Sequence, residues 1–158
     1  MRLRLRGVAI FCACHDAGTA RRYASGMDTQ STYDVTHLFV AVCPEESANA
    51  VYLVNPSNEV VGVVDTEIGG RFHTSEGPVD AETQSRRVFI GAFAAVLIEM
   101  TSDQEFAAHD VWWDVTYDAA GARTTHRFEA VRGLGAARSF RRLPVLDRPG
   151  LVVRRVAP

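Results

Sequence analysis

The chain has 158 residues, of which 47% are hydrophobic and 23% charged, with a formal net charge of −2. This length and composition predict one globular domain and exclude a disordered, collagen-like or coiled-coil protein. The longest nearly apolar run, residues 88–98, is too short to span a bilayer, and the absence of lysine excludes lysine chemistry.

The first 26 residues combine an arginine-rich start with a short apolar stretch at residues 7–14. We expect residues 1–26 to be a disordered N-terminal extension, with Met27 as the expected true start of the protein. A secretory signal peptide within residues 1–20 is the alternative, in which case the protein is secreted.

Three cysteines, Cys12, Cys14 and Cys43, cannot form a complete set of disulfides. This favours a reducing compartment, and we therefore expect a cytoplasmic protein unless the first residues act as a signal peptide.

From Thr32 onward, short apolar strands alternate with turn residues. We expect strands at residues 35–42, 49–55 and 60–66, the last two joined as a hairpin through a type I turn at Asn55-Pro56. Gly69-Gly70 predicts a second turn, and the polar residues 74–85 predict a loop.

The apolar segment 88–100 predicts two short strands, or one bent strand, with a break at residues 91–93. A final strand is expected at residues 151–156. Between them, residues 110–129 predict a hairpin whose type I turn is closed by Asp118 and Gly121. That register places Trp112 opposite Arg127 and Trp113 opposite His126, and keeps one face largely apolar.

Short strands separated by turns indicate an all-β fold, an antiparallel β-sandwich of about 7–8 strands in residues 27–158. The Asn55-Pro56 turn and the strand Gly-Ala-Phe-Ala-Ala-Val-Leu-Ile-Glu at residues 91–99 resemble immunoglobulin-like sandwich domains in architecture. The resemblance implies a fold and no function.

Charge is unevenly distributed along the chain. Residues 27–131 carry 17 acidic residues and five arginines, whereas residues 132–158 carry seven arginines and one aspartate. We expect the basic C-terminal segment, from about residue 132, to fold back over the acidic body, where the two fields cancel. An arginine-rich arm for nucleic acid is the alternative. Only Phe140 lies among these arginines, whereas single-strand binders interleave aromatic residues, so nucleic acid is not the expected partner.

Three residues of the predicted 110–129 hairpin are candidate binding residues: Trp112, Asp114 and Arg127. The predicted register puts them on the outward face, where arginine over tryptophan makes a cation–π pair. Aromatic and arginine side chains anchor interfaces. The alternative is that the C-terminal segment or another strand covers this face, so that Trp112 belongs to a secondary core.

These residues predict a non-catalytic binding or protein-interaction module with a protein or peptide partner and no cofactor. A carbohydrate-binding domain using the same residues is the alternative, with a glycan as ligand. A metal-dependent enzyme is a weaker alternative, with His73, His109 and His126 as metal ligands brought together from different strands. A homodimer could form through an exposed strand edge.

Overall fold

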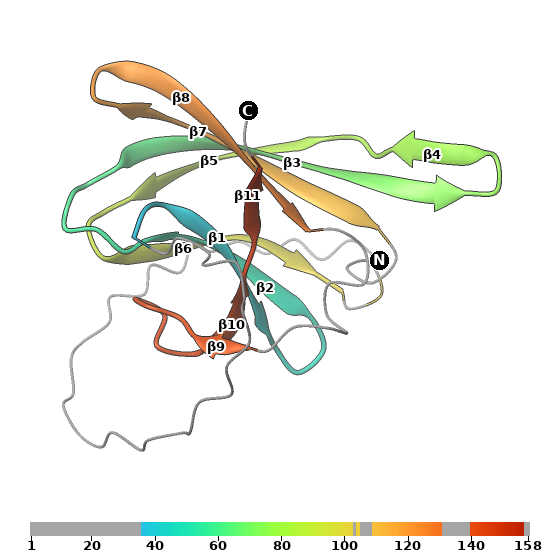
Figure 1. The fold of residues 1–158 in the computed structure, drawn as a ribbon, viewed down its shortest axis with the longest axis horizontal. Coiled ribbons are helices and arrows are strands. Elements are labelled where there is room, and N and C mark those ends of the chain that lie inside the picture. The colour runs from blue at the N-terminus through green and yellow to red at the C-terminus, as the bar shows by residue number, and fades with distance from the viewer. Residues whose placement is uncertain (1–35, 103, 105–108, 131–139, 157–158) are drawn as a thin grey trace.

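The computed structural model describes residues 36–102, 104, 109–130 and 140–156. Two β-sheets lie face to face (Figure 1), and the strand pairings among these residues are antiparallel. The all-β antiparallel sandwich predicted from the sequence is therefore confirmed, while an immunoglobulin-like strand order stays a prediction.

The strands divide unevenly between the two layers. The five-stranded sheet contains, in spatial order, β6 (Ala94–Thr101), β2 (Asn49–Asn55), β1 (Phe39–Pro44), β10 (Pro149–Val152) and β9 (Arg141–Arg142). The six-stranded sheet contains β11 (Arg154–Val156), β8 (Ala122–Ala130), β7 (Asp110–Ala119), β3 (Gly62–Thr74) and, along the far edge of β3, β4 (Gly77–Asp80) and β5 (Gln84–Ile90). The described residues thus form eleven strands rather than the expected seven or eight.

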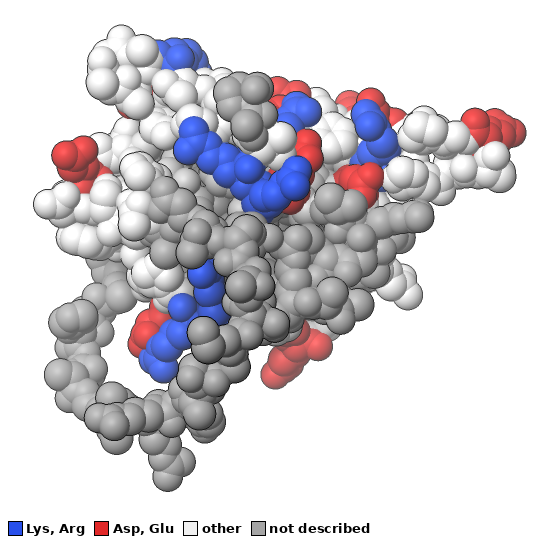
Figure 2. Space-filling view, in the orientation of Figure 1, with Lys and Arg blue, Asp and Glu red and all other residues white. Residues whose placement is uncertain are grey.

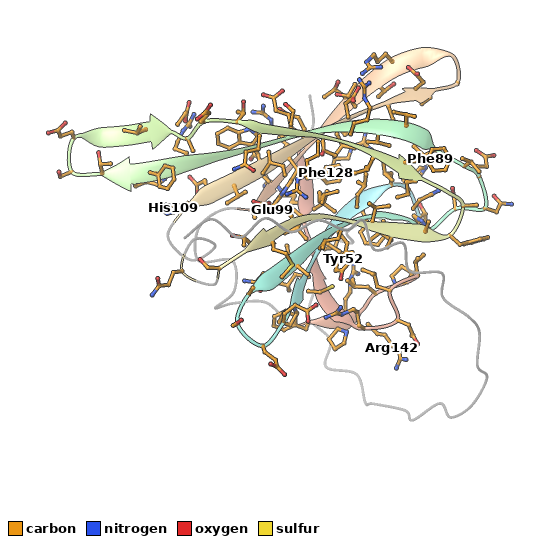
Figure 3. All side chains as sticks on the ribbon, turned by 180° about the vertical axis from the view of Figure 1, so that it is seen from behind. Tyr52, Phe89, Glu99, His109, Phe128 and Arg142 are labelled. Atoms are coloured by element: carbon orange, nitrogen blue, oxygen red, sulfur yellow. The ribbon has the colours of Figure 1, made fainter. Side chains whose placement is uncertain are left out.

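A side-chain hydrogen bond joins the two sheets. Trp113 in β7 is fully buried, and its Nε1 donates to Glu99 Oε2 in β6 at 2.8 Å. Figure 3 shows Glu99 between the two layers. Because side chains alternate along a strand, the inward direction of Trp113 fixes the outward direction of its neighbours in β7.

A bulge in β6 turns Glu99 towards the six-stranded sheet. Val51 pairs with Glu99, whereas Tyr52 pairs with Leu97, so Ile98 is an extra residue in β6. In a strand without a bulge, Glu99 would lie on the same face as Leu97, two residues before it, and would be directed away from Trp113. The bulge therefore makes the contact between the sheets possible.

The five-stranded sheet is covered on both faces. All seven residues of β2 are buried, and partly buried Val145 and Leu146 pack against the same core. Gly150 in β10 allows a close approach: a Cβ there would lie 2.4 Å from Leu143 Cδ1 and 2.9 Å from Cys43 Sγ.

Residues 141–156 of the basic segment supply strands to both sheets. Arg148 in this segment donates to Glu45 Oε1 at 2.6 Å, and its guanidinium lies 5.9 Å from the ring centroid of Tyr52. This part of the segment thus contacts acidic and aromatic groups of the body.

Strands β1 and β2 occupy the segments predicted at residues 35–42 and 49–55, with β1 beginning later, at Phe39. The predicted break in residues 88–100 is also confirmed, because β5 ends at Ile90 and β6 begins at Ala94. These two strands belong to different sheets, so the break carries the chain across the sandwich.

Residues 49–66 do not form the predicted hairpin, because β2 and β3 belong to different sheets. Strands β1 and β6 already pair with both edges of β2, so the next strand has no place beside it. Asn55, which is 1% exposed, holds the crossing: its Nδ2 donates to the carbonyls of Glu59 and Gly91, both at 2.7 Å. Its Oδ1 accepts the backbone N–H of Ser57 at 3.1 Å.

Two further predictions in residues 69–85 are wrong. Gly69 and Gly70 lie within β3 rather than in a turn, and the predicted loop at 74–85 contains β4 and the start of β5. The first polar residues of this segment form a tight turn between β3 and β4, in which Thr74 Oγ1 donates to the carbonyl of Gly77 at 2.7 Å.

The final predicted strand, residues 151–156, is divided at Val153 between β10 and β11. Val153 N donates to Val40 O at 2.9 Å, and the chain then passes from the five-stranded to the six-stranded sheet. Leu151, Val152 and Val153 are all buried, which a single half-exposed strand would not allow.

Strands β7 and β8 form the predicted hairpin, but each residue of β7 pairs two residues further along β8 than expected. Trp112 lies opposite Glu129, and Asp114 lies opposite Arg127. The predicted type I turn is wrong: the two-residue turn is Ala120-Gly121, with φ of 51° and 80°. Two positive φ values are typical of a type I′ turn, whose twist matches that of the strands. A shift of two leaves each side chain on its predicted face.

The N-terminal extension at residues 1–26, the start at Met27, and Cys12 and Cys14 lie outside the described residues. Within the described part of the chain, no helix is long and apolar enough to cross a membrane.

Asn55→Ala is expected to lower the free energy of unfolding by about 3 kcal/mol, because two carbonyls lose a donor and one backbone amide loses its acceptor. Asn58→Ala, at an exposed position in the same crossing, should change it by less than about 0.5 kcal/mol. Urea denaturation measures both variants. Equal effects would show that Asn55 does not hold the crossing.

Ala120→Asn is expected to stabilise the protein by about 1 kcal/mol, because asparagine tolerates the positive φ that strains alanine. Ala119→Asn changes the last residue of β7, next to the turn, and should not raise the stability because asparagine is disfavoured in strands. Thermal unfolding of the two variants compares them, and a gain at both positions would contradict the assigned turn.

Candidate functional site

The outer face of the six-stranded sheet, which points away from the five-stranded sheet, holds the candidate binding residues. Trp112 and Asp114 alternate with the buried Trp113 in β7, so they point outwards. Arg127 lies opposite Asp114 in β8 and is on the same face. The structure therefore brings the three candidates together.

Trp112 is packed against the sheet by Gly69. A Cβ on Gly69 would lie 2.4 Å from Cε2 and Cζ2 of the indole, so only glycine leaves room for the ring. The guanidinium of Arg127 lies over the ring, 5.5 Å from its centroid. The expected cation–π pair forms across a diagonal of the sheet, because Glu129 is directly opposite Trp112.

Arg127 is fixed by a two-point ion pair. Its Nε donates to Asp114 Oδ1 at 2.8 Å and its Nη2 to Asp114 Oδ2 at 2.6 Å. These hydrogen bonds to Asp114 raise the pKa of Arg127 above its ordinary value. About half of the Arg127 side chain, 48%, remains exposed, so its other N–H groups face solvent.

A hollow of about 360 Å³ lies on the outer face beside Trp112 and Arg127. Its wall is mostly polar and is formed by Arg71, Asp80, Asp110, Val111, Trp112, Arg127, Glu129 and Ala130. Arg71 Nε donates to Asp80 Oδ1 at 2.6 Å, so a second arginine is held there by a carboxylate.

Further ion pairs extend this pattern across the sheet. Asp65 accepts from Arg87 Nε at 2.6 Å and from Arg123 Nη2 at 2.5 Å. The hydrogen bonds from Arg87, and next from Arg123, hold the pKa of Asp65 below its ordinary value. Figure 2 shows arginine and acidic side chains side by side along the six-stranded sheet. The face is therefore a mosaic of both charges.

An apolar patch at one end of this sheet was missed from the sequence. Val63 and Phe89 are directly opposite each other in β3 and β5, and are 56% and 64% exposed. Val60 and Phe93, just beyond the same strand ends, are 63% and 62% exposed. Figure 3 shows Phe89 near the end of the sheet. We call these four residues the apolar patch.

The three candidate metal-binding histidines do not form one ligand set. His73 Nε2 lies 2.9 Å from Asp110 Oδ2. His109 packs edge-on against Phe72 with ring centroids 4.0 Å apart, and its buried Nδ1 has no hydrogen-bond partner within the described part of the chain. His126 contacts Arg155, and burial, followed by the charge of Arg155, lowers its pKa. Among the described residues, no three His, Cys, Asp or Glu side chains are placed to hold a metal ion.

The free thiol of Cys43 is buried in the five-stranded sheet. Burial raises its pKa to about 11, so the group is protonated at neutral pH. A protonated, buried thiol is a structural group rather than a nucleophile.

The chain matches no family model, no curated protein and no solved structure in the three comparisons. Its function is therefore inferred from its own residues.

Gly69→Ala is expected to lower the free energy of unfolding by about 1–3 kcal/mol, because the added methyl group collides with the indole of Trp112. Gly70→Ala is the matched control, since its nearest atom would be a carbonyl oxygen at an ordinary 3.5 Å. Chemical denaturation with near-ultraviolet circular dichroism measures both. Trp112→Ala should remove the penalty of Gly69→Ala, and a penalty that persists in the double variant would contradict the contact.

Proposed function

We propose that this protein is a non-catalytic protein-interaction domain that binds its partner through the outer face of the six-stranded sheet. The observation that carries the proposal is the hollow in which Trp112, Arg127 and Arg71 lie together. Tryptophan and arginine in shaped pockets account for much of the binding energy at protein interfaces. The exposed apolar patch adjoins the same face and supports a protein partner.

The arginines of this face are held before a partner arrives. Asp114 fixes Arg127, and Asp80 fixes Arg71, each through hydrogen bonds to the guanidinium. A side chain that is already ordered loses less entropy on binding. The remaining N–H groups can donate to carbonyl or carboxylate oxygens of a partner.

A glycan is the second candidate ligand, favoured by the carboxylates of the hollow. Asp80, Asp110 and Glu129 could accept hydrogen bonds from sugar hydroxyls. A sugar also needs an open aromatic face on which to stack. The ring of Trp112 has Gly69 beneath it and Arg127 over it, so a partner that contacts the arginine fits this geometry better.

The test compares three immobilised full-length chains: wild type, Arg127→Ala and Arg141→Ala, whose exposed arginine lies in the other sheet. Proteins retained from extract of the native cells are quantified by mass spectrometry. We expect a partner retained by wild type and Arg141→Ala, and reduced about thirtyfold by Arg127→Ala, the effect of losing a central anchor residue.

Equal retention by all three chains, or equal loss in both variants, would contradict the proposal. Circular dichroism checks that Arg127→Ala keeps its fold. A sugar panel followed by thermal shift tests the second candidate: stabilisation of wild type that is lost in Trp112→Ala would favour the glycan instead.

A further inference from the structure

The free edges of the two sheets differ in how they are protected. Edge strands in proteins are commonly short, bulged, or interrupted by proline, which prevents pairing with other chains. Among the described residues, β9 and β11 have two and three residues, β4 has four and contains Pro78, and β6 has a bulge. These edges are poor templates for an added strand.

β5 is the exception in the described part of the chain. It has seven residues without proline, and it pairs with β3 in an uninterrupted register from Ile90 to Gln84. Its other edge has no paired strand among the described residues. A regular strand of this length presents unpaired N–H and C=O groups that an extended segment can use.

The side chains of β5 divide the edge into two halves. Its C-terminal half carries Val88, Phe89 and Ile90, and exposed Phe89 belongs to the apolar patch. Its N-terminal half carries the exposed Arg86 and Arg87. An added strand would therefore meet apolar side chains along one half and basic side chains along the other.

The basic half of the edge is incompletely neutralised by its ion pairs. Among the described residues, Asp65 is the one carboxylate that pairs with Arg87, and it is shared with Arg123. Arg86 has no ion pair among the described residues. A second copy of β5, paired antiparallel over its full length, would place Arg87 opposite Arg87 of the other copy, and like charges directly opposite are destabilising. The charge therefore disfavours self-pairing and favours an acidic segment.

We propose that an extended segment of the partner adds to the six-stranded sheet as an antiparallel strand along β5, with apolar residues first and acidic residues after them. The strands of this sheet pair antiparallel, and we expect the same of the added strand. This direction places the apolar residues of the partner segment opposite Phe89 and its acidic residues opposite Arg86 and Arg87. Backbone hydrogen bonds supply affinity and the side chains supply direction and specificity. This inference rests on the proposed function, since it names the kind of partner that the domain binds.

The probe is the N-acetylated, C-amidated heptapeptide Ile-Val-Val-Glu-Glu-Thr-Thr, labelled for fluorescence anisotropy and titrated with the full chain. Arg86→Glu is expected to weaken binding about tenfold, whereas Arg141→Glu, an equal charge change in the other sheet, leaves it unchanged. The peptide with both Glu replaced by Lys should show the opposite preference and bind Arg86→Glu better than wild type.

A second measurement does not depend on any protein variant. Alternate N-methylation of the peptide backbone removes N–H donors on one edge, so one of the two methylation patterns should abolish binding to the wild-type chain. The sequence in reverse order should bind more weakly, because one Glu would then lie opposite Val88 and a valine would lie opposite Arg86.

Absence of binding at about 1 mM peptide, or binding that Arg86→Glu and both methylation patterns leave unchanged, would overturn the inference. Concentration-dependent dimers that Val88→Pro abolishes would also overturn it, in favour of a second copy on this edge. Either failure leaves the proposed function standing if Arg127→Ala still loses its partner. If the peptide inference fails and Arg127→Ala also keeps its partner, the proposed function is contradicted as well.

Discussion

The hydrogen bond from Trp113 to Glu99 sets the orientation of β7, and the candidate binding face depends on that orientation. Side chains alternate along a strand, so burying Trp113 commits Trp112 and Asp114 to the outside. A slip of one residue would move the ion pair of Asp114 into the core and carry a large desolvation penalty. The residues of β7 that are buried on its inner face therefore determine which residues lie on its outer face. The extra residue Ile98 in β6 contributes to the same constraint, because the bulge turns Glu99 towards Trp113.

The two sheets differ in how completely their faces are buried. The five-stranded sheet is covered on both faces, as the complete burial of β2 shows, and it holds much of the apolar core. The six-stranded sheet packs one face against that core and presents the other with arginines already bound to carboxylates. Exposed ion pairs of this kind add little to stability. Their main physical effect is to order side chains whose remaining donors point outwards.

The alternation of apolar and polar residues predicted much of this molecule, within limits set by tertiary packing, whereas the predicted turns were wrong. The sandwich, the inward and outward faces of residues 110–129 and the grouping of Trp112, Asp114 and Arg127 followed from local patterns. The hairpin at 49–66 failed because the pairing of β1 and β6 with β2 depends on residues far along the chain. The predicted turn at Gly69 is wrong because the contact of Gly69 with Trp112, from another strand, has no local signal in the sequence. The exposure of Phe89 was not predicted, because Phe89 lies in an apolar run of the kind that is typical of a strand buried on both faces.

The passage of the chain from β10 to β11 at Val153 has a consequence for how the molecule assembles. Ala41 in β1 pairs with Val152, so a strand near the start of the domain receives one of its neighbours only from the far end. Closing so long a loop is slow, and contacts of this kind form late. A ribosome-bound chain that has exposed β1 and β2 still lacks β10, which pairs with β1, and β11, which pairs with β8. The domain can therefore close its sandwich only after the segment around Val153 has left the ribosome.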